Sequence, residues 1–226
     1  YRLTIDHVKK VLADIKRVCP DYDPDRGYEL AGFVWFQGWN DMVDSGTYPN
    51  RGRPGGYDMY SDLLAQFIRD VRKDLSAPKL PFVIGVIGVG GPTDEYSPRQ
   101  QRYKDIHQNF RDAMAAPAAL PEFEGNVAAV RTEKYWDMEV VKLRERERQI
   151  KEQVDEIRNQ MKEGKLSREA GNAALDKLYA ETFTPRELVI LKESTSNAEF
   201  HYMGSARIMA QIGKGFAEAM AEMLQK

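Results

Sequence analysis

The feature that most constrains the fold is an apolar segment, residues 30–37, that ends abruptly in the polar group Gln37-Gly38-Trp39-Asn40-Asp41. A run of Phe, Val and Trp residues predicts a buried strand of a parallel sheet. In open α/β sheets, ligands bind just beyond the carboxyl ends of the strands. Gln37 and Asn40 therefore lie where polar groups can take part in a reaction. Packing alone does not explain polar residues at these positions.

Helical and strand patterns alternate along the first part of the chain, which predicts an α/β fold with a doubly wound parallel sheet. Helical spacing of apolar residues is found at 3–18, 60–75 and 103–116, and short apolar runs predict strands at 30–37, 81–89 and 126–132. Three strands are few for a sheet of this kind. The chain starts at Tyr1, within a helical pattern and without an initiator methionine, so we expect a further strand upstream.

A different pattern follows at residues 138–181 and predicts an antiparallel helical hairpin that projects from the main domain. Its first helix carries apolar residues at heptad-like spacing, namely Leu143, Ile150, Val154, Ile157 and Met161. Gly164 turns the chain into a second helix at 166–179. We therefore expect a main domain of residues 1–137 and 183–226, interrupted by an inserted hairpin at 138–182.

Two helix signals follow the hairpin. Thr184-Pro185-Arg186-Glu187 has the form of a capping box with proline at the first helical position, and a last helix is expected at about 205–224.

The composition excludes several classes of protein. A formal net charge of −2 gives no general attraction to nucleic acid or to anionic membranes, and no apolar run is long enough to span a membrane. A single cysteine and three dispersed histidines make neither a disulfide framework nor a metal site. The glycine-rich stretch at 85–91 leads into Pro92 instead of a helix, which argues against a nucleotide site. We expect no cofactor.

His201 lies on a loop directly before the last helix, where an imidazole is well placed to act as a general base. The alternative is a structural surface histidine, and the sequence context leaves both open. Gln37 can donate its amide N–H to an oxyanion, or it can be a buried amide that satisfies loop backbone. Trp39 and Trp136 can form a sugar-stacking surface or belong to the core.

At Trp35-Phe36-Gln37-Gly38 and at residues 201–206, His-Tyr-Met-Gly-Ser-Ala, the chain resembles the sialate O-acetylesterase-like domain. That family belongs to the carbohydrate acetylesterases of the SGNH hydrolase superfamily. The resemblance covers roughly residues 1–136 and 184–226. It implies a three-layer, flavodoxin-like α/β/α fold and removal of acetyl groups from sugars by a serine nucleophile.

Carried over by position, the resemblance makes His201 the catalytic base and Gln37 the amide donor. Asn40 and Asp41 become functional if this segment is compared instead with the superfamily's Gly-x-Asn-Asp block. We also expect Trp39, Asp41 and Tyr202 to contact the substrate.

The chain departs from the family pattern at three places. The Gly-Gln-Ser-Asn motif that holds the nucleophile is missing from the 226 residues, so we expect it upstream of Tyr1. Trp39 replaces the glutamate that usually follows Gln-Gly. Ala198 stands where the acid is expected, three residues before the histidine, so the orienting carboxylate is either Glu199 or absent.

The main hypothesis is therefore a serine-type carbohydrate O-acetylesterase whose partner is an acetylated carbohydrate. The alternative is a non-catalytic carbohydrate-binding or interaction protein on a degenerate esterase fold. A third, minor expectation is that the hairpin mediates oligomerisation. The family resemblance favours an exported bacterial enzyme, although no residue in the chain identifies the compartment.

Overall fold

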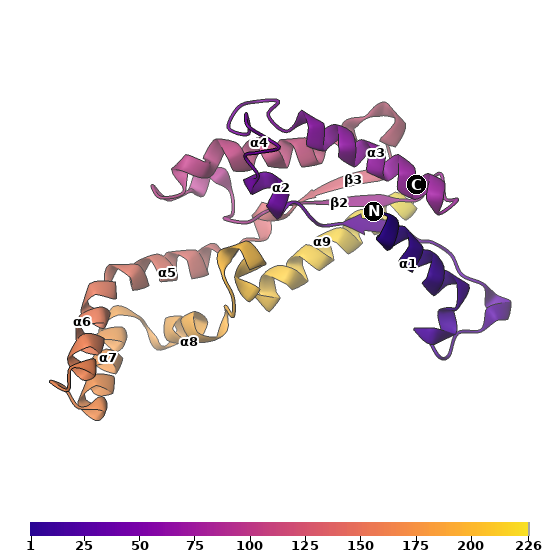
Figure 1. Ribbon diagram of the computed structural model, residues 1–226. Helices are drawn as coiled ribbons and strands as arrows, with labels where there is room; N and C mark the ends of the chain where they lie inside the picture. The colour runs from indigo at the N-terminus through magenta and orange to yellow at the C-terminus, as the bar shows by residue number, and fades with distance from the viewer. Residues whose placement is uncertain (226) are drawn as a thin grey trace. The chain divides into compact units, whose positions relative to one another are not determined.

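The computed structural model describes residues 1–225, which form two compact units (Figure 1). The sheet unit consists of Tyr1–Gly88, Pro92–Lys134 and the chain from Ile212 onward. The helical unit consists of Val89–Gly91 and Tyr135–Gln211. No helix among the described residues is long and apolar enough to cross a membrane.

The sheet unit is built on three parallel strands in the order β1-β2-β3. The strands are β1 (Phe33–Trp35), β2 (Phe82–Val86) and β3 (Val127–Arg131). Every residue of β2 is buried, as expected for a central strand of a parallel sheet covered on both faces. The predicted α/β class and the positions of all three strands are confirmed.

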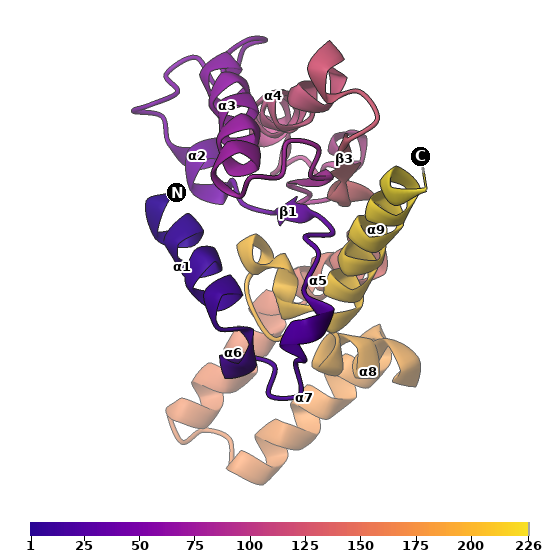
Figure 2. The same ribbon diagram turned by 90° about the vertical axis from the view of Figure 1, so that its right-hand side faces the viewer.

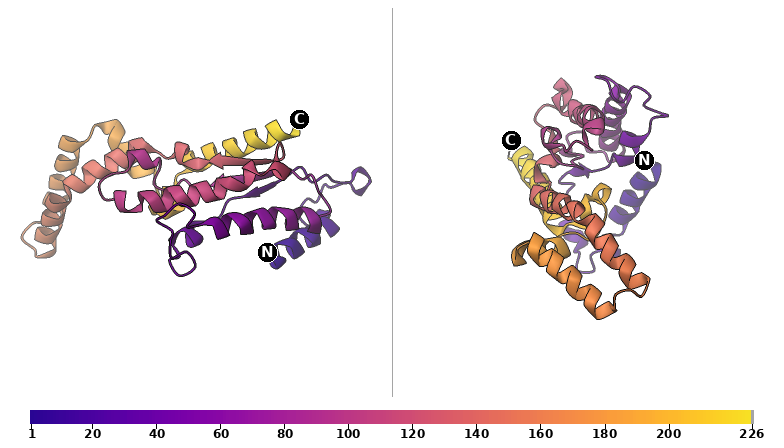
Figure 3. Two further views of the ribbon diagram at one scale, coloured as in Figure 1. Left: turned by 90° about the horizontal axis from the view of Figure 1, so that it is seen from above. Right: turned by 90° about the vertical axis from the view of Figure 1, so that its left-hand side faces the viewer.

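Parallel strands need crossover connections, and helices supply them here. The crossovers run through α3 (Asp58–Asp74) and α4 (Lys104–Ala115), which pack against each other on one face of the sheet (Figure 3). The end of α9 (Ala206–Leu224) covers the other face, where Phe216 lies so close to Gly85 that an added Cβ would be 2.5 Å from its ring. The predicted last helix is thus confirmed, and the sheet lies between two helical layers.

β1 differs from the predicted buried strand. It spans three residues instead of eight, and within the described sheet it is the edge strand. Phe33 and Trp35 face α3 and contact Phe67, with ring centroids 5.9 Å and 4.6 Å apart. Val34 points to the opposite face and is 45% exposed. The expectation of a fully buried strand was wrong because the run of apolar letters does not show that only one face is covered.

The first helix, α1 (Arg2–Ala13), is shorter than the predicted 3–18 and is followed by a 3-10 turn at Ile15–Arg17. The pattern predicted an apolar stripe, yet Ile5 is the only fully buried residue of α1 and Leu3 is 85% exposed. A short helix, α2 (Trp39–Val43), follows β1 directly.

The helical unit contains a hairpin, but not with the predicted first arm. Its helices are α5 (Met138–Gln149), α6 (Lys151–Lys162), α7 (Arg168–Thr182) and α8 (Pro185–Glu193). α6 and α7 form the hairpin (Figure 2), and Gly164 makes the turn at φ +73°. The backbone leaves the helical conformation at Ile150, which separates α5 from α6.

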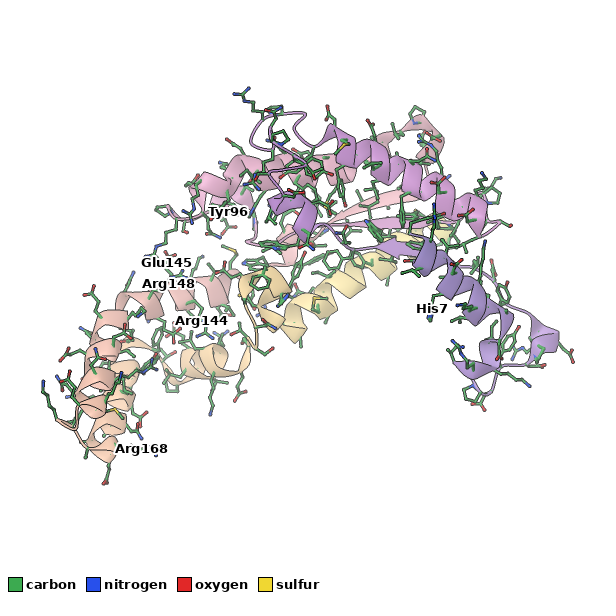
Figure 4. The ribbon with its side chains drawn as sticks, in the orientation of Figure 1. His7, Tyr96, Arg144, Glu145, Arg148 and Arg168 are labelled. Carbon is green, nitrogen blue, oxygen red and sulfur yellow. The ribbon has the colours of Figure 1, made fainter. Side chains whose placement is uncertain are left out.

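The break at Ile150 gives the two halves of the predicted heptad seam different partners. Leu143 of α5 belongs to a buried cluster with Phe183 and Leu191. Arg144 (Figure 4) ties the same helices together, because its guanidinium donates to the backbone oxygen of Leu191 at 2.7 Å. α5 therefore pairs with α8, and only α6 pairs with α7. The predicted domain boundaries, and the idea that the hairpin is an insertion, stay predictions.

The capping box that opens α8 is confirmed. The backbone N–H of Glu187 donates to the Thr184 hydroxyl at 3.3 Å, and the Thr184 N–H donates to the Glu187 carboxylate at 2.8 Å. Pro185 occupies the first helical position, where its missing N–H costs no hydrogen bond.

Candidate active site

The first group of candidate residues stands where β1 turns into α2. Gly38 makes this turn with a φ of +156°. A Cβ at this position would lie 2.8 Å from a ring carbon of Phe110 in α4. Only glycine fits such a close approach, so the chain can turn sharply and leave Gln37 at the carboxyl end of the strand.

The Gln37 side chain is exposed and is oriented by a carboxylate one helical turn later. Its Nε2 donates to Asp41 Oδ2 at 2.9 Å. The amide nitrogen carries two N–H groups, so one can hold the side chain in place while the second can donate to another acceptor. This arrangement suits a donor to an oxyanion.

The backbone of Gln37 is held as well. Its carbonyl oxygen accepts from the Tyr60 hydroxyl at 3.2 Å. Burial raises the pKa of Tyr60, which keeps this hydroxyl protonated and able to donate. Gln37 is thus positioned from both its side chain and its main chain.

A cavity of about 190 Å³ opens beside Gln37. Its wall is mainly aromatic and aliphatic, with the Gln37–Asp41 pair as part of the lining; the lining residues are Trp35, Gln37, Asp41, Tyr48, Tyr60, Leu63, Leu64 and Phe67. Pockets for drug-sized ligands measure roughly 300–1,000 Å³, so this one suits a small group. The predicted contact of Asp41 with substrate stays a prediction, and sequence reasoning missed Trp35 and Tyr60 as lining residues.

The other predicted residues of this segment lie on α2. Trp39 is half-buried and Asn40 is exposed. The predicted substrate contact of Trp39 and the predicted catalytic role of Asn40 stay predictions.

The second group of candidate residues belongs to the helical unit and lies on residues 196–205, called the His201 loop below. Backbone hydrogen bonds cross-link this loop. The N–H groups of Ser196 and Asn197 both donate to the Met203 carbonyl oxygen, at 2.9 Å and 3.1 Å, and the Met203 N–H donates to Ala198 at 3.1 Å. The loop is therefore a closed structure and not an open connection.

Three consecutive residues of the His201 loop have left-handed backbone conformations. The φ angles are +52° at Tyr202, +57° at Met203 and +60° at Gly204. This conformation is unfavourable for non-glycine residues by about 1–2 kcal/mol each and is concentrated at functional sites. Burial of Tyr202, whose ring centroid lies 5.9 Å from that of Trp136, helps to hold it.

Trp136 is itself only 5% exposed, so it belongs to the core and not to an open stacking surface. The neighbouring Asp137 connects two helix starts. Its carboxylate accepts from the Val140 N–H at 3.2 Å, which caps α5, and forms an ion pair of 3.1 Å with Arg207 at the start of α9. The exit of the His201 loop is anchored in this way. The predicted contact of Tyr202 with substrate stays a prediction.

The His201 imidazole is exposed and has a hydrogen-bond partner that sequence reasoning missed. Its Nδ1 lies 3.0 Å from Asn197 Oδ1, and the Phe200 ring contacts the imidazole at a centroid distance of 4.2 Å. Glu199, the predicted orienting acid, is also exposed. The structure gives His201 an amide partner four residues earlier in the chain instead of this carboxylate.

Gln37 belongs to the sheet unit and His201 to the helical unit. Their predicted meeting at one reaction centre therefore stays a prediction. Within residues 1–225, no cluster of three or more His, Cys, Asp or Glu side chains has the geometry to hold a metal ion.

The sheet unit thus belongs to the class of α/β proteins with a parallel sheet and polar groups beyond the carboxyl end of a strand. The family model for carbohydrate esterases described as sialic acid-specific acetylesterases matches residues 7–134. The match covers more than half of the chain, and the protein belongs to this family. It includes Gln37 and Asp41 and ends before His201.

No curated protein and no solved structure shows significant similarity to the chain. At the level of the family, the activity is hydrolysis of acetyl esters on carbohydrates.

Proposed function

We propose that the protein is a serine-type carbohydrate O-acetylesterase of the SGNH hydrolase class, with Gln37 as an oxyanion donor and His201 as the general base. The observation that carries this proposal is the Gln37–Asp41 pair beside a small cavity, within the segment that matches the esterase family.

In the proposed reaction, a serine hydroxyl attacks the carbonyl carbon of the acetyl ester and His201 takes its proton. The carbonyl oxygen becomes an oxyanion, which accepts the second N–H of the Gln37 amide. Collapse of this intermediate breaks the bond to the sugar oxygen, which leaves with the proton from His201. A water molecule then repeats the sequence on the acetyl-serine and releases acetate.

The proposal places the serine on a segment upstream of Tyr1. Support comes from β1, which pairs with β2 along one edge only among the described strands. An upstream strand beside β1 would complete the central part of a flavodoxin-like sheet. Its carboxyl end would then lie next to Gln37, where the strand order changes direction and ligands bind.

The substrate is an acetylated sugar. The cavity beside Gln37 has the size of a small group, and its aromatic wall suits the apolar face of an acetyl group or a sugar ring. We propose that Trp39 and Asn40 extend this surface along α2, and that Tyr202 contacts the substrate.

The test is hydrolysis of an aryl acetate by the chain joined to its upstream segment, or supplied with that segment as a second chain. His201→Ala should lower kcat by about a thousandfold or more, because the nucleophile loses its base. His7→Ala is the matched control, since His7 is an exposed histidine on α1 (Figure 4) and should leave the rate unchanged. Undiminished turnover in His201→Ala contradicts the proposal.

The alternative function is carbohydrate binding without catalysis on a degenerate esterase fold. Two sequence departures favour it: Trp39 in place of the family glutamate, and Ala198 in place of the expected acid. Titration calorimetry with acetylated sugars and labelling with a fluorophosphonate separate the two functions. Binding without labelling of the protein that includes the upstream segment supports the alternative.

We also propose that residues 138–182 are an insertion in the esterase domain and that the α6/α7 hairpin mediates self-association. The helices carry exposed charges of both signs, such as the Lys151–Asp155 pair, so contacts between copies would be polar and weakened by salt. Deletion of residues 140–180 should lower the mass measured by sedimentation to that of a smaller oligomer. An unchanged number of subunits contradicts this role.

A further inference from the structure

The Asn197 amide has an orientation that its surroundings determine. Its Oδ1 lies 2.8 Å from the backbone nitrogen of Ala198, and a backbone N–H can only donate. The end of the amide that faces Ala198 is therefore the oxygen, and the usual uncertainty between the oxygen and the nitrogen of an amide does not arise here.

The same oxygen faces the imidazole of His201, with 3.0 Å between Oδ1 and Nδ1. An amide oxygen can only accept, so the hydrogen of this contact is on Nδ1. In a neutral imidazole the other nitrogen, Nε2, then has a free lone pair. The hydrogen bond to Asn197 thus selects one of the two tautomers of His201.

We infer that Asn197 is the positioning residue of His201: it holds the imidazole in the tautomer whose Nε2 accepts a proton. The consequence for catalysis rests on the proposed function, in which His201 Nε2 takes the proton of the serine. The assignment of the tautomer does not rest on it. Asn197 thereby does the work of the carboxylate that Ala198 replaces, and Glu199 is not needed.

The His201 loop holds donor and acceptor in place. The Asn197 N–H donates to Met203 at 3.1 Å, and the His201 N–H donates to Ala198 at 3.0 Å, so both backbones are fixed to the same loop. The left-handed turn ends at Gly204, where a Cβ would clash with the Ser196 hydroxyl oxygen and lie 2.9 Å from the Asn197 nitrogen. Neither residue can shift without disturbing these bonds.

The tautomer is measured directly on the chain as it stands, by long-range ¹H–¹⁵N correlation spectra of ¹⁵N-histidine-labelled protein at alkaline pH. We expect the Nδ1 signal of His201 in the range of protonated nitrogens and the Nε2 signal in the range of unprotonated ones. The signals are assigned by their loss in His201→Gln. A spectrum with Nε2 protonated overturns the inference.

Variants test whether Asn197 is the cause. Asn197→Ala removes the acceptor, and the His201 signals should move toward the mixture of tautomers found in free histidine. Asn197→Asp restores an oxygen acceptor and should restore the Nδ1-protonated form. Glu199→Gln is the matched control and should change nothing. Unchanged His107 signals show that the sheet unit of each variant is folded.

Esterase activity, measured on the chain joined to its upstream segment, gives a second and independent test of Asn197. Asn197→Ala should lower kcat by about 10- to 100-fold with little change in KM, because it removes positioning of a base and not a substrate contact. Asn197→Asp should recover most of this loss.

The two sets of results separate the two proposals. A tautomer shift with no esterase activity in any variant contradicts the proposed function and leaves Asn197 as the positioning residue. An unchanged tautomer in Asn197→Ala, or a shift in Glu199→Gln, overturns the inference whatever the activity.

Discussion

The two halves of the proposed site, one at Gln37 and one at His201, orient their side chains by the same kind of local contact but are supported differently. In each, an oxygen acceptor four residues away in the sequence orients a nitrogen group: Asp41 orients Gln37, and Asn197 orients His201. The Gln37 half stands on the end of a strand and the first turn of a helix. The His201 half stands on a loop with consecutive left-handed residues.

The difference lies in what supports each pair. Gln37 lies between β1 and α2, and β1 pairs with the fully buried strand β2, so the position of Gln37 follows from the packing of the sheet unit. The position of His201 depends on backbone hydrogen bonds within its loop and on the contact between Tyr202 and Trp136. A site on a loop reaches comparable order only if the loop is cross-linked, and four predictions test this comparison.

The largest effect is expected in the Gln37 half. Gln37→Ala should lower kcat on an aryl acetate by about 10²- to 10³-fold, the usual cost of removing one oxyanion donor. Gln66→Ala is a matched control, because Gln66 forms the same kind of bond with Asp70, at 2.8 Å, on the exposed face of α3. Equal activity of the two variants would remove Gln37 from the site.

The next effect concerns pH and the sheet unit alone. Burial, and to a lesser degree the nearby Arg111 charge, lowers the pKa of His107 to about 4 from its ordinary value of 6.5. The Tyr96 hydroxyl (labelled in Figure 4) lies 2.6 Å from His107 Nδ1 and also accepts a hydrogen bond from Arg111 at 3.3 Å. The folded protein therefore holds His107 neutral.

In the unfolded state His107 binds a proton near pH 6.5, whereas the folded state binds it only near pH 4. Above pH 6.5 this histidine therefore leaves the free energy of unfolding unchanged. As the pH falls from 6.5 to about 4, the free energy of unfolding decreases by about 3 kcal/mol in total. Denaturant unfolding at several pH values measures this slope. His107→Asn keeps a hydrogen-bonding group beside Tyr96 but cannot bind this proton, so it should flatten the curve between pH 6.5 and about 5. A slope that survives in this variant contradicts the assignment.

A third prediction tests the His201 half. Gly204→Ala should destabilise the His201 loop by about 2 kcal/mol, because alanine is strained at a left-handed φ and its Cβ meets Ser196. Hydrogen exchange should accelerate at the Asn197 and Met203 amides and stay unchanged in β2. Gly213→Ala, at a glycine of α9 with open space around it, is the control and should not accelerate exchange in the loop.

The smallest effect is expected for Asp41. Asp41→Ala removes the acceptor that orients Gln37 and should lower kcat by about tenfold, less than loss of the amide itself. Asp41→Asn keeps an oxygen that can accept the same bond and should retain most of the activity. If both variants behave alike, the carboxylate acts through its charge and not by orienting the amide.

Many of the helices and strands of this protein are predictable from the sequence because they follow from local residue patterns. The apolar run at 81–89 gives β2, helical spacing gives α3 and α4, and Thr184 to Glu187 gives a helix start. Each of these depends on neighbours within one or two turns. The family is also predictable, because the segment around Gln37 keeps its order of residue types.

The partners of the site residues were harder to predict. Sequence reasoning looked for an acid near His201 and left two alternatives, Glu199 or no acid, whereas the loop brings Asn197 to the imidazole. The sequence did contain a signal for Asn197. It precedes Gly204 in a segment with the composition of a turn, where Asn side chains commonly bond to nearby groups. This signal was too weak to separate Asn197 from Glu199, because both lie within reach in sequence.

The amino-acid sequence by itself determined the α/β class, the order of the elements and the family, since these depend on periodicity and on a local motif. Only the tertiary structure decided that α5 pairs with α8 after the break at Ile150, that one face of β1 stays exposed, and that Asn197 faces His201. Those features depend on which surfaces are covered and on how a strained loop closes. Both are settled by contacts between segments, and local residue patterns do not encode them.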